Sequence, residues 1–127
     1  MSKYTARRID LVTPGFYKTR KVRGGPWVGA QIVVTDGMIY VTEDGAETAH
    51  GVPEADFGDI VISATMAGEV FRDPIVRVAW FGVEISEAEY RHLLSLSAWA
   101  AQNQPDHPAA KPDQPIRMDA IPISFIV

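Results

Sequence analysis

The dipeptide Asp36-Gly37 is the feature that most constrains the fold of this chain. It separates two apolar runs rich in β-branched and aromatic side chains, residues 27–35 and 38–42. A two-residue hairpin turn of type I′ needs positive φ at both central positions, and Asp-Gly meets that need. The sequence therefore predicts a β-hairpin centred on this turn.

A third strand is predicted just before the hairpin. Residues 16–23 combine aromatic, β-branched and long basic side chains, which is typical of a strand with one solvated face, and Gly24-Gly25-Pro26 ends it. We thus expect an antiparallel meander over residues 16–42. Such a meander is similar to small SH3-like sheets, which serve many unrelated functions.

The clearest helix signal lies near the C-terminus, over residues 86–103. Ser86 and Glu89 have the spacing of a capping box, and Pro105 prevents the helix from continuing. The predicted fold class is α+β, with the small meander packed against this one C-terminal helix. Apolar side chains at helical spacing predict its buried face as Tyr90, Leu93, Leu94, Ala98 and Ala101.

The middle of the chain gives weaker signals. Residues 43–58 are predicted to form a long solvated loop, because they are rich in acidic residues and glycine. Residues 59–66 are predicted to form a strand. Residues 75–81 are short and apolar, and their periodicity fits either a strand or a buried helical turn.

The two ends of the chain are expected to differ from the centre of a single domain spanning residues 1–127. Residues 1–14 are predicted to be frayed. Four prolines within residues 105–115 predict an extended, polyproline-like path at the start of a C-terminal arm, residues 105–127. Residues 116–127 are too apolar for a free tail, so we expect them to pack across the domain or into a second copy, in a homo-oligomer.

Composition excludes several classes of protein. The chain has 127 residues and no cysteine, which excludes disulfide scaffolds, thiol nucleophiles and cysteine-based metal sites. No apolar run approaches the roughly 20 residues of a membrane span. The first residues do not resemble a signal peptide, so we expect a cytoplasmic protein with no membrane partner.

Catalytic and metal-binding motifs are not found in the sequence. It has no phosphate-binding P-loop, no nucleophile elbow and no His-Glu-x-x-His motif. We expect no catalytic residue, no metal site and no cofactor. The three histidines, His50, His92 and His107, lie far apart. The acidic residues of the middle segment lack the spacing of a calcium loop, and we expect Glu43, Asp44, Glu47, Glu54, Asp56 and Asp59 to be solvated.

Charge is distributed unevenly along the chain. Residues 1–35 carry seven basic residues and one acidic residue, whereas the other 92 carry five basic and fifteen acidic residues. Such asymmetry is typical of a face that binds an anion or a partner, although basic strands also pack beside acidic segments of the same chain. The net charge of −4 argues against binding to duplex nucleic acid.

The candidate binding site is the basic segment that ends the first strand. Arginine forks bind phosphate or carboxylate, glycine backbone permits close approach and N–H donation, and tryptophan offers a flat face. Against this interpretation, Gly-Gly-Pro is also simply a tight corner, and a tryptophan that opens a strand commonly lies in a core. The candidate ligand- or partner-binding residues are Lys18, Arg20, Lys21, Arg23, Gly24, Gly25 and Trp27.

Three blocks carry a resemblance to a known group of proteins. They are residues 15–32, which contain Gly-Gly-Pro-Trp-Val, residues 85–94, Ile-Ser-Glu-Ala-Glu-Tyr-Arg-His-Leu-Leu, and residues 107–116 with Ile121-Pro122 beyond them. Together they resemble small phage and prophage proteins with no assigned function. Gly29 departs from the pattern, which has proline after the valine. The resemblance implies a phage accessory protein in the bacterial host, and it transfers no catalytic residue.

We therefore expect a non-catalytic phage accessory protein that acts by binding in the bacterial cytoplasm. One possible target is a host protein, such as a defence protein that the phage inhibits. The other is a small anionic ligand, such as a nucleotide messenger that the protein sequesters. The alternative is a structural or assembly role in the virion, which an extended C-terminal arm would suit.

Overall fold

A computed structural model describes residues 13–47, 51–71 and 73–116 of the chain. It confirms the hairpin: β2 (Val28–Thr35) and β3 (Met38–Glu43) are antiparallel and are joined by Asp36 and Gly37, with φ of 51° and 75°. β1 (Gly15–Thr19) pairs antiparallel with β2 and completes the predicted meander. β1 ends at Thr19, earlier than the predicted strand over 16–23.

Short strands extend the meander to a six-stranded sheet within the described residues. β4 (Ala46–Glu47) and β5 (Val52–Pro53) pair with opposite ends of β3, along the edge that β2 leaves open. β6 (Val83–Glu84) pairs antiparallel with β1 at the other edge of the sheet. The predicted loop over residues 43–58 thus contains two strands and a 3-10 turn, Glu54–Asp56.

The strand predicted for residues 59–66 is wrong, because these residues lie in helix α1 (Phe57–Met66). Their β-branched side chains favour a strand locally, but propensity is a weak constraint where burial decides. Phe57 and Val61 lie four residues apart on one helical face and are both buried, whereas Met66 is exposed. The tertiary contact of that face therefore overrides the local preference.

Residues 75–81 belong to helix α2 (Pro74–Phe81), so the helical option was the right one. Asp73 caps the helix, because its carboxylate accepts a hydrogen bond from the Ile75 N–H at 2.9 Å. Pro74 occupies the first turn, where a backbone N–H would have no partner within the helix, so the lack of an N–H in proline costs no hydrogen bond. These two residues place a helix start at position 74.

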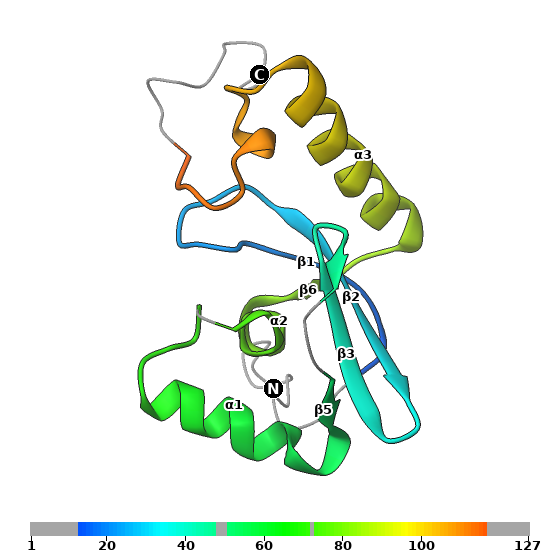
Figure 1. Cartoon of the computed structure of the whole chain (residues 1–127), viewed down its shortest axis with the longest axis vertical. Helices are drawn as coiled ribbons and strands as arrows, with labels where there is room; N and C mark the ends of the chain where they lie inside the picture. Colours follow the sequence, from blue (N-terminus) through cyan, green and yellow to red (C-terminus); the bar gives the residue numbers. More distant parts are fainter. Residues whose placement is uncertain (1–12, 48–50, 72, 117–127) are drawn as a thin grey trace, which may run out of the picture.

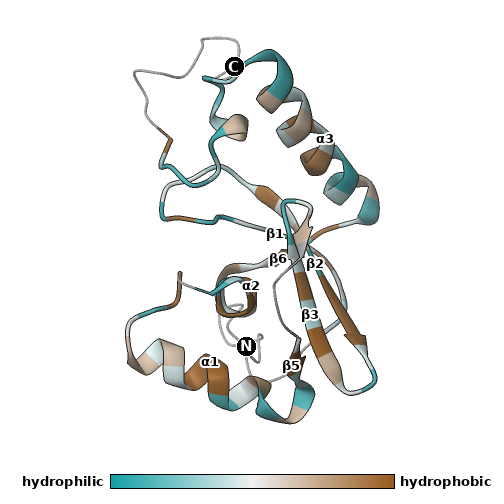
Figure 2. Ribbon diagram, viewed as in Figure 1, coloured by the Kyte–Doolittle hydropathy of each residue, from teal (hydrophilic) through white to brown (hydrophobic). Residues whose placement is uncertain are grey.

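The hydrophobic core lies between one face of the sheet and the pair α1 and α2. Figure 1 shows both helices beside the lower part of the sheet, and Figure 2 shows hydrophobic residues along β2, β3 and α2. The sheet contributes alternate residues, as expected for a face with a period of two. The core consists of Tyr17, Ala30, Ile32, Ile39 and Val41 from the sheet and Phe57, Val61, Ile75, Val78 and Ala79 from the helices.

Helix α3 (Glu87–Asn103) packs near the upper end of the sheet. The predicted cap is confirmed, because the Glu89 N–H donates to the Ser86 hydroxyl at 3.1 Å. Tyr90 is buried against Phe16, with ring centroids 4.8 Å apart. A Cβ atom at Gly29 would lie 3.0 Å from Tyr90, so the glycine permits this close approach.

The buried face of α3 differs in part from the predicted one. Ala98 and Ala101 are exposed, whereas Ala100 is fully buried. The helix contacts both the sheet and the 3-10 turn η3 (Pro108–Ala110). In its C-terminal half, the Trp99 ring lies edge-on to His107, the residue before η3, with ring centroids 6.3 Å apart. The face of α3 that is buried in its C-terminal half is therefore set in part by the chain segment that follows the helix.

The predicted polyproline-like path is interrupted in the part of the arm that the structure describes. η3 (Pro108–Ala110) begins after His107, whose Nδ1 accepts a hydrogen bond from the Ala109 N–H at 3.0 Å. The chain then turns back, and the Ile116 N–H donates to the Gly24 carbonyl at 2.8 Å. The predictions for residues 1–12 and 117–127 lie outside the described residues.

The hairpin turn generates the first testable prediction. Gly37 has φ of +75°, and no atom lies within 4 Å of a Cβ built there, so a substitution changes only backbone strain. Gly37→Val should lower the free energy of unfolding by about 1–3 kcal/mol in urea denaturation. Gly37→Asn is the control and should lose less, because asparagine tolerates positive φ. Equal stability of the valine variant and the wild type would contradict the turn geometry.

Asp44 lies in the turn after β3, and its side chain contacts helix α3. Its φ is +55°, its N–H donates to the Gly29 carbonyl at 2.7 Å, and the Ser97 hydroxyl donates to its carboxylate at 3.2 Å. Burial raises the pKa of Asp44 above the ordinary value of 3.8, although the Ser97 hydrogen bond and the charge of Lys21 act in the opposite direction. The folded protein therefore disfavours the ionised form of this carboxyl.

This shift predicts a pH-dependent effect of Asp44→Asn. Between 3.8 and the raised pKa, the folded state binds more protons than the unfolded state, so stability falls as pH rises. Asparagine lacks this titration, and the variant should gain stability relative to the wild type as pH rises through that window. Urea denaturation between pH 3 and pH 7 measures the difference. Asp36→Asn is the matched control at an exposed positive φ, and an equal trend in both variants would argue against burial as the cause.

Candidate functional site

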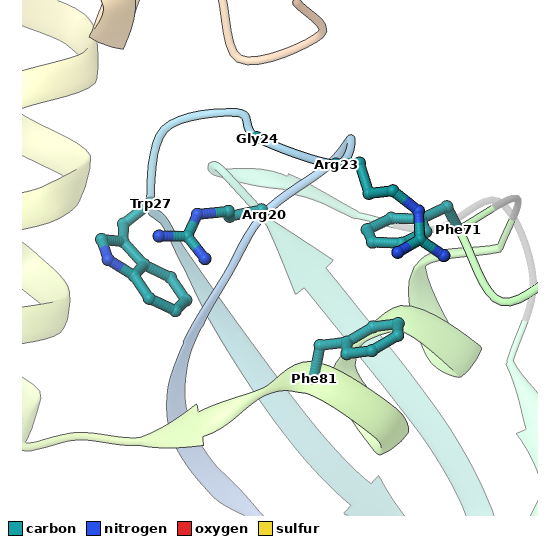
Figure 3. Close-up of a pocket in the computed structure, with 6 residues that line it drawn as sticks. All are labelled: Arg20, Arg23, Gly24, Trp27, Phe71 and Phe81. Atoms are coloured by element: carbon teal, nitrogen blue, oxygen red, sulfur yellow. The ribbon is translucent and has the colours of Figure 1, made fainter. Parts of the chain in front are cut away.

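The candidate site is a cleft of about 210 Å³ between the loop that follows β1 and the end of α2. The loop spans residues 20–27, and we call it the basic loop. Phe81 is the last residue of α2, and Phe71 lies in the connection between α1 and α2. Figure 3 shows the side chains gathered around the open space. The lining residues are Arg20, Arg23, Gly24, Trp27, Phe71 and Phe81.

Each arginine of the cleft lies over an aromatic ring. The guanidinium carbon of Arg20 is 4.0 Å from the Trp27 ring centroid, and that of Arg23 is 5.1 Å from the Phe71 ring centroid. Figure 3 places these two pairs on opposite sides of the opening. Stacking orients a guanidinium and leaves its N–H groups, which point outward in the plane, for other partners.

Neither arginine is neutralised by the rest of the described structure. No carboxylate among residues 13–47, 51–71 and 73–116 forms an ion pair with Arg20 or Arg23, and both side chains are exposed. The protein carries sixteen acidic residues and a net charge of −4, so acidic groups are not scarce. The cleft thus brings together two arginines that no described carboxylate neutralises, in a protein of net negative charge.

Phe71 and Phe81 form the apolar wall of the cleft. Their rings are stacked, with centroids 4.9 Å apart and an angle of 14° between the planes. Phe81 remains 39% exposed, although it is large and hydrophobic. The cleft therefore has apolar aromatic side chains beside its two cations.

The basic loop holds its shape by a tight turn over residues 22–25. The Gly25 N–H donates to the Val22 carbonyl at 3.0 Å, and Gly24 has φ of +71°. These features match a type II turn, in which the third residue needs positive φ. The turn therefore uses the Gly25 N–H, one of the two glycine N–H groups in the candidate segment.

The C-terminal turns hold the outer side of the basic loop. Ile116 bonds to the Gly24 carbonyl, and Lys21 forms an ion pair with Asp113 at 3.2 Å. On the other side, Lys18 forms an ion pair with Glu89 of α3 at 3.4 Å. The two lysines are therefore paired with carboxylates, unlike the two arginines.

Four of the seven candidate residues line the cleft, namely Arg20, Arg23, Gly24 and Trp27, whereas Lys18, Lys21 and Gly25 do not. Strand alternation would have placed Arg20 and Arg23 on opposite faces, but β1 ends before either of them. Sequence reasoning missed Phe71 and Phe81. Their one local signal is a pair of apolar aromatic residues on either side of the Asp73-Pro74 helix start.

A buried ion pair is connected to the cleft through Phe71. Arg77 of α2 is 6% exposed and Glu43 at the end of β3 is 3% exposed. The Arg77 Nε donates to one Glu43 carboxylate oxygen at 3.2 Å and an Nη donates to the other at 2.5 Å. The second Nη of Arg77 donates to the Phe71 carbonyl. Glu43 was expected to be solvated, and this prediction is wrong because Arg77 supplies its partner inside the fold.

The described residues contain no group of three or more metal-ligating side chains placed to hold an ion. None of the helices in that part of the chain is long and apolar enough to cross a membrane. Comparisons with family models, curated proteins and solved structures give no match. The function must therefore be argued from the geometry of the cleft.

The buried ion pair generates a stability prediction. Removing one partner leaves a buried charge without compensation, so Arg77→Met and Glu43→Gln should each lower the free energy of unfolding by about 3–5 kcal/mol. The double variant should lose less than the two single losses together, because neither charge remains buried alone. Urea denaturation of all four proteins measures this coupling. Additive losses would show that the two side chains do not depend on each other.

Proposed function

We propose that this protein is a non-catalytic binding protein and that its cleft takes up a small anionic ligand, such as a nucleotide messenger. The observation that carries the proposal is the pair Arg20 and Arg23. Both line one cleft, both lie over aromatic rings, and neither has a carboxylate partner among the described residues.

The energetics of the basic loop support a ligand-binding role for these arginines. The structure of the loop rests on its internal turn, on Ile116 and on the Lys21–Asp113 pair, none of which involves an arginine side chain. Exposed arginines contribute little to stability. Their charge is therefore available to phosphate or carboxylate oxygens, which a guanidinium binds through two parallel hydrogen bonds.

The shape of the site favours a small ligand over a flat protein surface. Small-molecule sites are concave, mostly apolar and carry a few well-placed polar groups. The cleft has this character, with Phe71, Phe81 and Trp27 around two guanidiniums.

The resemblance to phage proteins suggests where such binding would act. We propose a phage accessory protein that sequesters its ligand in the bacterial cytoplasm, as a homo-oligomer. Inhibition of a host protein through the same two arginines, and a structural role in the virion, are the competing functions. Sedimentation of the purified protein bears on the last of these, because a large particle would favour a virion part.

Calorimetric titration of the full chain with inorganic pyrophosphate and with AMP tests the proposal. Arg20→Ala combined with Arg23→Ala should weaken binding at least about tenfold, since each charge-assisted contact contributes about 1.5–3 kcal/mol. Rising ionic strength should weaken binding by the wild type as well. The melting temperature of the double variant should stay within a few degrees of the wild type.

Arg91→Ala combined with Lys111→Ala is the matched control. It removes two exposed cations that form ion pairs with Glu87 and Asp106, away from the cleft. This variant should bind both anions like the wild type. If both double variants lose the same affinity, the loss reflects the change in net charge and not the cleft. If the melting temperature of the cleft variant falls sharply, the two arginines stabilise the fold. Either result overturns the proposal, as does the absence of any anion binding.

A further inference from the structure

We infer that the cleft selects a ligand in which one aromatic ring lies next to one phosphate, as in a nucleoside monophosphate. This inference rests on the proposed anion-binding function and adds the class of ligand to it. It excludes larger messengers in which two nucleotides are joined. The two aspects that carry it are the size of the cleft and the place of the aromatic wall relative to the guanidiniums.

The size of the cleft limits the ligand to a single ring. Its volume is about 210 Å³. Sites for drug-sized ligands commonly range from about 300 to 1,000 Å³. One base with one phosphate reaches this limit, and a second nucleotide would have to remain outside.

The aromatic wall provides the surface for that ring. Phe81 is 39% exposed, and Phe71 stacks on it at 4.9 Å, so the two rings support each other. The buried pair Arg77–Glu43 helps to fix this wall, because Arg77 also donates a hydrogen bond to the Phe71 carbonyl. A base that contacts an aromatic side chain gains affinity whatever its identity, since every base has a π-face.

The two guanidiniums provide the surface for the phosphate. Arg20 and Arg23 are each occupied on one face by their stacking with Trp27 and Phe71. The Trp27 ring is therefore already in contact with a cation, which leaves Phe81 as the ring best placed for the ligand. The N–H edges of the arginines suit the oxygens of a phosphate, which a neutral nucleoside lacks.

Calorimetric titration of the full chain with four probes separates these contributions. The probes are AMP, ribose 5-phosphate, adenosine and a cyclic dinucleotide. AMP should bind about tenfold more tightly than ribose 5-phosphate, because only AMP brings a ring to the wall. Adenosine should bind more weakly than AMP, and the cyclic dinucleotide should bind no better than AMP.

Phe81→Leu tests the ring contact directly. Leucine keeps an apolar side chain at the end of α2 but removes the flat ring. The variant should lose the preference for AMP over ribose 5-phosphate. Trp99→Leu is the matched control, because it removes a ring that is 46% exposed on α3, outside the cleft. That variant should keep the wild-type preference.

The outcomes distinguish this inference from the function on which it rests. Equal affinity of AMP and ribose 5-phosphate, or an unchanged preference in Phe81→Leu, overturns the ring selectivity but leaves arginine-dependent anion binding intact. Tighter binding of the cyclic dinucleotide than of AMP overturns the size limit. If none of the phosphates binds, the proposed function and the inference both fail.

Discussion

The buried ion pair between Arg77 and Glu43 connects the sheet to the helical layer. Glu43 ends β3, and Arg77 lies near the middle of α2, so the pair sets the position of α2 relative to the end of the sheet. The same guanidinium binds the Phe71 carbonyl, which places the aromatic wall of the cleft. A buried charge requires a partner with good geometry. This requirement allows few arrangements of strand, helix and connection.

The cleft combines a loop held by several contacts with two arginines that no described carboxylate neutralises. The basic loop is held by its own turn, by the C-terminal turns and by the Lys21–Asp113 ion pair, and its arginines form no ion pair with a described carboxylate. Stacking on Trp27 and Phe71 limits the rotation of long side chains that would otherwise lose entropy on binding. A preorganised pair of cations in an acidic protein is well suited to binding anions.

Local chemistry accounts for the parts of the fold that were predicted from the sequence. The Asp36-Gly37 turn and the Ser86 cap each depend on a few consecutive residues whose backbone geometry is restricted. The strand predicted for residues 59–66 was wrong because its β-branched residues carry only a weak preference, and burial of Phe57 and Val61 decided the matter. The length of β1 was overestimated for a related reason, since basic side chains suit a strand edge and a loop equally well.

The sequence by itself determined the meander, the C-terminal helix and four residues of the candidate site, because these depend on turn chemistry, capping and the clustering of charge along the chain. Only the tertiary structure decided that Lys18 and Lys21 are paired with carboxylates, while Arg20 and Arg23 are paired with none in the part of the chain that the structure describes. It also brought Phe71 and Phe81 to the basic loop from about fifty residues away. Contacts between residues so far apart in the sequence depend on how the helices pack on the sheet, and local sequence patterns do not predict that packing.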